Sequence, residues 1–65
     1  MKIRLIIKEK EFNPISLAEL FRILVQTGLE YDKSFELRKI ASEFYKSNEN
    51  KKIIAKYGYR IILSK

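Results

Sequence analysis

One short segment carries both the start and the stop signal of a helix, and it constrains the fold more than any other feature. Ser16 is followed three positions later by Glu19, the spacing of a capping box, in which the serine side chain accepts from a backbone N–H of the first turn. Gly28 stands where helices commonly end in a left-handed residue. The hydrophobic-staple positions hold Ile15 and Leu20. These signals predict a helix over 17–27.

An alternation of apolar and basic residues precedes this helix. Residues 2–8 follow a period of two, which places alternate side chains on opposite faces of a strand. We expect the inward side chains to be Ile3, Leu5 and Ile7 and the outward ones to be Lys2, Arg4, Ile6 and Lys8. Asn13-Pro14 then separates the strand from the helix.

The helix over 17–27 is more apolar than a helix on one sheet requires. Its apolar residues cover well over half of the circumference, whereas such a helix needs an arc of little more than about 100°. One interpretation is that a second helix and the loops cover the excess. The other is an interface with a second copy or another protein, formed by Leu17, Phe21, Leu24 and Val25.

A second helix is predicted from Asp32 or Ser34 to about Ser47. It has a narrow apolar stripe and an otherwise charged surface of mixed sign, which is typical of an amphipathic helix on a core. Its stripe consists of Leu37, Ile40, Ala41 and Phe44.

The segment 47–58 has two interpretations. It is a strand joined by a three-residue loop at 57–59 to a last strand, or a short third helix that ends at Gly58. The strand is favoured because it places Ile53, Ala55, Ile61 and Leu63 on the inner face. Its outer face then pairs Lys56 with Arg60, Ile54 with Ile62 and Lys52 with Ser64.

Both interpretations belong to the α+β class and to a single domain over residues 1–65. The favoured architecture is a small two-layer β-α-α-β-β domain with two helices on one face of a short sheet. The alternative is β-α-α-α-β, in which residues 37–57 resemble a helix-turn-helix variant.

Composition excludes several classes of chemistry. The 65 residues include no Cys and no His, so disulfides, structural zinc and the usual thiol nucleophiles and general bases are absent. Gly28 and Gly58 are isolated, so no glycine-rich phosphate loop exists. We therefore expect no enzyme, cofactor, metal or small-molecule substrate. The apolar runs are short, so we expect no signal peptide or membrane span, and a cytoplasmic protein.

The formal net charge of +6 is concentrated in the first and last segments of the sequence. Residues 1–10 carry four cations and one acid, and residues 51–65 carry five cations and no acid. Residues 11–50 carry five cations and seven acids. If both segments are strands of one sheet, the fold gathers their cations into a surface that suits a polyanion.

The leading functional hypothesis is therefore a small basic nucleic-acid-binding protein, most simply a DNA-binding regulator that uses a sheet or wing surface. Lysine and arginine would neutralise phosphates, and the two tyrosines near the predicted turn would stack on bases or sugars. The candidate residues are Lys2, Arg4, Lys8, Lys52, Lys56, Tyr57, Tyr59 and Arg60.

Two alternatives stay open. The first is a protein-binding module, such as a regulator or inhibitor from a phage or plasmid, that acts through the apolar face of helix 17–27 or an open sheet edge, with a homodimer as one form of it. The second is a solvated basic sheet without a polyanion partner, because lysine on edge strands also prevents aggregation.

Overall fold

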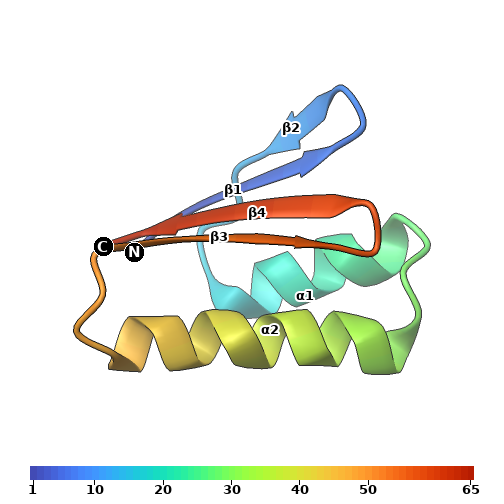
Figure 1. The fold of residues 1–65 in the computed structure, drawn as a ribbon. Helices are drawn as coiled ribbons and strands as arrows, with labels where there is room; N and C mark the ends of the chain where they lie inside the picture. Colours follow the sequence, from blue (N-terminus) through green and yellow to red (C-terminus); the bar gives the residue numbers. More distant parts are fainter.

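The first and last segments of the chain form one antiparallel sheet, and both helices pack on the same face of it (Figure 1). The computed structural model describes residues 1–65. In chain order the elements are β1 (Lys2–Ile7), β2 (Lys10–Phe12), α1 (Leu17–Gln26), α2 (Tyr31–Lys46), β3 (Lys51–Lys56) and β4 (Tyr59–Ser64). The sheet order is β2-β1-β4-β3. The predicted two-layer α+β domain is confirmed, with one additional strand, and the alternative with a third helix is wrong because residues 51–56 are a strand.

The centre of the sheet is the antiparallel pair β1 and β4. Ile3 lies opposite Leu63, and Leu5 lies opposite Ile61, with all four side chains buried against the helices. The predicted inward residues of β1 are thus confirmed, Ile7 being half-buried. Because side chains alternate along a strand, the neighbouring Lys2, Arg4 and Ile6 point away from the helices.

Local hydrogen bonds at both ends fix α1. The Glu19 N–H donates to Ser16 Oγ at 3.1 Å, as the capping signal predicts. At the other end Gly28 has φ of 103°, and the Leu29 N–H donates to the Leu24 carbonyl at 3.1 Å in a Schellman motif. The predicted staple is wrong. Ile15 is 82% exposed, because the neighbouring Pro14 is the residue that is buried where the chain enters the helix.

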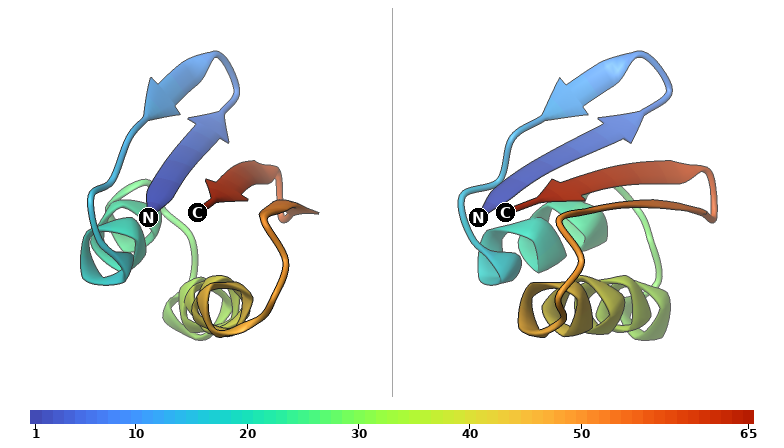
Figure 2. Two further views of the ribbon diagram at one scale, coloured as in Figure 1. Left: turned by 90° about the vertical axis from the view of Figure 1, so that its left-hand side faces the viewer. Right: turned by 60° about the vertical axis from the view of Figure 1, so that its left-hand side comes forward.

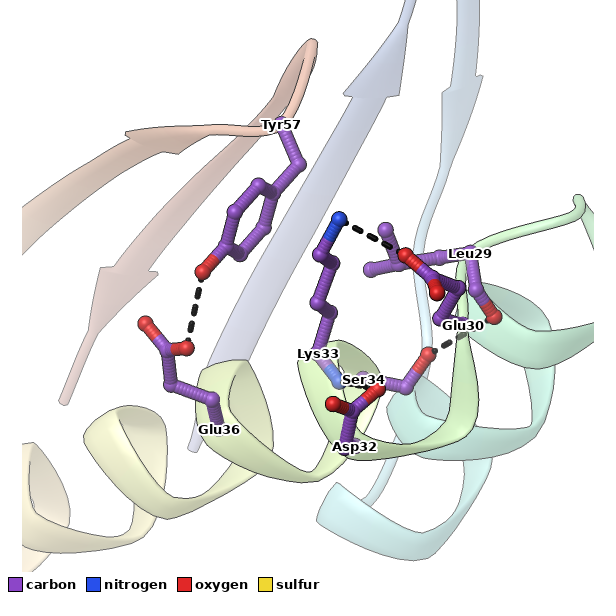
Figure 3. A network of polar contacts seen from close by, with 7 residues as sticks. All are labelled: Leu29, Glu30, Asp32, Lys33, Ser34, Glu36 and Tyr57. Atoms are coloured by element: carbon purple, nitrogen blue, oxygen red, sulfur yellow. Dashed lines mark hydrogen bonds and ion pairs between the residues drawn. The ribbon is translucent and has the colours of Figure 1, made fainter.

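Packing rather than capping positions α2. Its first residue is Tyr31, and Glu30 makes no side-chain cap. The predicted residues Leu37, Ala41 and Phe44 are buried, and Ile40 is half-buried. Ser34 is fully buried, and its hydroxyl donates to the Leu29 carbonyl at 3.3 Å (Figure 3). This bond fixes the linker between the two helices.

The last hairpin has a different register from the predicted one. Its turn contains two residues, Tyr57 and Gly58, with φ of 56° and 81°, and β3 pairs so that Lys56 lies opposite Tyr59. Positive φ at both positions is the requirement of a type I′ turn, whose twist matches that of the strands. A shift of one residue moves every side chain of β3 to the other face. Ile54 is therefore buried, and Ile53 is 58% exposed.

The register also removes an unfavourable pair. The three-residue loop would have placed Lys56 opposite Arg60, whereas the observed hairpin places Ala55 opposite Arg60. Like charges directly opposite one another on two strands are destabilising, so the two-residue turn is favoured on this ground as well.

The additional strand, β2, forms a small hairpin with β1. Ile7 lies opposite Lys10, and Lys8 and Glu9 form the turn, so Lys8 is a turn residue with φ of 56° rather than the last residue of a strand. The hairpin rises away from the helices at one edge of the sheet (Figure 2). Neither helix has the length and apolar character needed to cross a membrane.

Candidate nucleic-acid interface

The side of the sheet opposite the helices, here called the open face, has an aliphatic centre and a basic surround. Strand pairing places three rows of side chains across it. In order across the strands these rows are Lys2, Ser64 and Lys51; Arg4, Ile62 and Ile53; and Glu11, Ile6, Arg60 and Ala55.

Charge is divided between the two layers of the domain. Residues 1–12 and 51–65, which hold all four strands, carry nine cations and two carboxylates. Residues 13–50, which hold both helices, carry five cations and six carboxylates. The fold therefore gathers both basic segments into one sheet, and the net positive charge of the protein belongs to that layer.

Three cations of the open face have no acidic partner. The protein has four ion pairs, and none of them includes Lys2, Lys51 or Arg60. Lys2 and Lys51 lie on either side of Ser64, on the strands that flank β4. Arg60 lies on β4 itself, between Ile6 and Ala55. These side chains are exposed and able to meet an anion in front of the sheet.

Arg4 is already paired. Its guanidinium donates from Nε and Nη2 to the two carboxylate oxygens of Glu11 on β2, at 3.1 and 2.9 Å. This bidentate contact lowers the pKa of the Glu11 carboxyl below its ordinary value, so the carboxylate stays charged. Of the predicted binding residues, Arg4 is thus the cation on this face whose charge is compensated.

A shallow basic hollow of about 500 Å³ lies at the end of the sheet where the β1–β2 and β3–β4 turns meet. Its lining includes three cations, Lys8, Lys56 and Arg60, and no carboxylate. The remaining lining residues are Ile6, Ala55, Tyr57, Gly58 and Tyr59. The hollow extends the basic surface from the open face around the edge of the molecule.

Lys52 and Lys56, which were predicted on the open face, lie on the helix-facing side of β3 because of the register. Lys56 Nζ pairs with the Glu36 carboxylate of α2. The Tyr57 hydroxyl donates to the other oxygen of Glu36 at 2.8 Å (Figure 3). The hydrogen bond from Lys56, followed by that from Tyr57, lowers the pKa of Glu36. These residues fasten the hairpin to the helix layer.

Tyr59 is not available for stacking. Its side chain is buried in the core, and its hydroxyl lies 2.9 Å from the Thr27 hydroxyl at the end of α1. Tyr57 is 42% exposed, and its ring lies 5.2 Å from Lys33 Nζ, beside the helix layer. Of the two tyrosines predicted to stack on bases or sugars, Tyr59 is therefore too buried to do so, and Tyr57 lies beside the helix layer rather than on the open face.

Lys51, the third unpaired cation of the open face, is not among the residues predicted from the sequence. Its position follows from the two-residue turn, which reverses the faces of β3. The signal that could have found it is the Tyr57-Gly58 dipeptide, interpreted as a type I′ turn with a glycine at its second position.

The four residues of the predicted interface on helix 17–27 also differ in whether they are buried or exposed. Leu24 is fully buried in the core, and Leu17 packs against that core. Leu17 and Phe21 are half-buried and Val25 is 38% exposed, so three of the four residues reach the surface at least in part. The second helix thus covers part of the apolar excess and leaves part of it at the surface.

Comparison of the chain with protein-family models, with curated proteins and with solved structures finds no match. The structure holds no group of three or more acidic side chains placed to bind a metal ion.

Proposed function

We propose that this protein binds nucleic acid, in the first place duplex DNA, through the open face of its sheet. The observation that carries the proposal is the division of charge: nine cations and two carboxylates in the sheet layer, against five cations and six carboxylates in the helix layer. Such a one-sided basic layer attracts a phosphate backbone and orients the protein on it.

The chemistry of the open face favours backbone contacts. Lys2, Lys51 and Arg60 have no carboxylate to displace before they meet a phosphate. No aromatic side chain lies among the residues of the open face, so unpaired bases have no stacking platform there. The aliphatic centre, which includes the 58% exposed Ile53, suits contact with sugars between two rows of phosphates.

The test compares two triple charge reversals. The first variant combines Lys2→Glu, Lys51→Glu and Arg60→Glu on the open face. The matched control combines Arg22→Glu, Lys33→Glu and Lys46→Glu on the helices, and both variants have a formal net charge of zero. Affinity for a duplex is measured over a salt series, because the salt slope on duplex DNA falls by about 0.9 for each phosphate that the variant no longer neutralises.

We expect the open-face variant to lose affinity roughly 100-fold, taking about 1 kcal/mol for each exposed phosphate contact. The control should stay within a few-fold of the natural protein. Equal losses in the two variants would show that net charge alone drives association and would contradict a binding face. Absence of micromolar affinity for any nucleic acid at low salt would remove the proposal.

A further inference from the structure

Four side chains form an aromatic cluster on the outside of the helix layer, away from the open face. The Phe21 ring of α1 packs edge-on against Tyr31 and Phe35 of α2, with centroid distances of 5.1 and 6.3 Å. The Arg38 guanidinium lies 5.9 Å from both phenylalanine rings. In this aromatic cluster the rings contact one another edge-on and the guanidinium makes cation–π contacts with two of them.

The aromatic cluster is unusually exposed for its composition. Tyr31 is 69% exposed and Phe35 is 50% exposed. At about 100° per residue, Phe35 lies on the opposite side of α2 from the buried Phe44, and therefore on the side of α2 away from the core. Large aromatic side chains gathered at a surface of this kind mark an interaction site.

The charges around Phe35 are self-complementary. Asp32 precedes Phe35 by three residues and Lys39 follows it by four, on the same flank of the helix. If a second α2 lies antiparallel, related by a twofold axis at Phe35, Asp32 of each copy meets Lys39 of the other. Neither residue takes part in an ion pair within the chain.

The same axis accounts for the most exposed tyrosine. A hollow of about 310 Å³ is lined by Phe35, Arg38, Lys39 and Ser42. Tyr31 precedes Phe35 by four residues, so the twofold operation places Tyr31 of the second copy over this hollow, beside Arg38. A parallel pair would instead oppose Asp32 to Asp32 and Lys39 to Lys39.

We propose that this surface binds a second copy of the chain, with the two α2 helices antiparallel about Phe35. The dimer contains two Asp32–Lys39 ion pairs and two tyrosines seated in the hollows. The open faces of the two sheets point away from the interface. The dimer proposal can therefore be tested independently of the nucleic-acid-binding proposal.

Sedimentation velocity over a concentration series tests the proposal. The variants are Asp32→Lys, Lys39→Glu and the double swap that combines them. Lys46→Glu is the matched control, since it makes the same charge change on the same helix. It lies beyond the overlap, because the second α2 begins at Tyr31 and reaches only as far as Lys39.

We expect the natural protein to form a dimer in a concentration-dependent equilibrium. Each single variant should weaken the dimer roughly tenfold or more, since two ion pairs become two like-charge contacts. The double swap should restore the dimer to within a few-fold, and Lys46→Glu should leave it unchanged. Restoration by the swap is specific to a twofold antiparallel pair, because only that arrangement brings the two positions together.

Tyr31→Ala provides an independent variant whose folding is not in question, because its side chain is mostly exposed. It should weaken the dimer at least tenfold. A protein that stays monomeric up to millimolar concentration would overturn the proposal. A dimer insensitive to Tyr31→Ala, or a folded double swap that remains as weak as the single variants, would overturn it as well.

Discussion

The two hairpins of the sheet are built alike but perform different tasks. Each reverses the chain in two residues, and each begins its turn with a non-glycine residue at φ of 56°, Lys8 in one and Tyr57 in the other. The β1–β2 hairpin contains three residue pairs, whereas the β3–β4 hairpin contains six. The longer one supplies four core side chains, namely Ile54, Tyr59, Ile61 and Leu63.

Each hairpin is also held by one glutamate, and the two hairpins differ in where that glutamate lies. Glu11 on β2 links the two strands of the β1–β2 hairpin by accepting hydrogen bonds from Arg4 on β1, on the open face. Glu36 binds the β3–β4 turn from the helix layer, through Lys56 and Tyr57. The β1–β2 hairpin is therefore a local attachment at the sheet edge, whereas the β3–β4 hairpin belongs to the cooperative core.

Gly58→Val should produce the largest effect, because it strains the turn that fixes the register of the core hairpin. Gly58 has φ of 81°, a conformation that β-branched residues rarely adopt, and a side chain would meet no atom within 4 Å. The penalty is therefore backbone strain, about 1–3 kcal/mol in the free energy of unfolding. Urea denaturation measures it.

Gly58→Asn is the control for this variant, because asparagine tolerates left-handed backbone. It should cost distinctly less than valine. If the two substitutions destabilise the protein equally, the turn does not need a left-handed residue at this position, and the register argument fails.

Lys8→Gly should have a smaller effect of opposite sign. Lys8 adopts a left-handed conformation, which costs a non-glycine residue about 1–2 kcal/mol. Glycine would remove this strain, but its larger conformational entropy in the unfolded chain would cancel roughly 0.5–1 kcal/mol of the resulting stabilisation. We expect slower hydrogen exchange in β2 and little change in global unfolding, because this hairpin is local.

Glu9→Gly is the matched variant one residue along the same turn. Glu9 is not among the residues with positive φ, so glycine brings only its entropic cost and should loosen the hairpin. Similar exchange rates in the two variants would show that the strain at Lys8 is not what limits the stability of β1–β2.

The sequence predicts those parts of the fold that depend on short-range chemistry. Ser16 and Gly28 define α1 because capping bonds form within four residues of each. Lys2 and Arg4 lie outward as predicted, because β1 alternates without ambiguity. β2 was missed because three residues show no periodicity and its turn contains no glycine.

The candidate site was predicted only in part, because the faces of β3 depend on one backbone angle. Gly58 is compatible with a two-residue turn or a three-residue turn. The two-residue turn forms only if Tyr57 also adopts a positive φ, and tyrosine has no local preference for that conformation. That choice determines whether Lys52 or Lys51 reaches the open face. The Tyr57-Gly58 dipeptide is compatible with the two-residue turn, and long-range packing of Ile54 against the helices selects that turn.

The smallest effect concerns acid, and it compares the two glutamates directly. Partner cations lower the pKa of both Glu11 and Glu36 below the ordinary value. A lowered carboxyl pKa stabilises the folded state above the ordinary glutamate pKa, about 4.3, and this contribution is lost as the pH falls through the lowered value. Both side chains are exposed to solvent screening, so the change below about pH 4.3 is modest.

Substitution by glutamine removes each titration and tests the assignment of the two hairpins. Glu36→Gln should flatten the acid limb of global stability measured by urea denaturation from neutral pH downward. Glu11→Gln should leave that limb nearly unchanged, speed hydrogen exchange in β2, and release Arg4 for phosphate contact, which should raise nucleic-acid affinity. If Glu11→Gln flattens the global acid limb as much as Glu36→Gln does, the β1–β2 hairpin is part of the cooperative core, and the distinction between a local and a core hairpin does not hold.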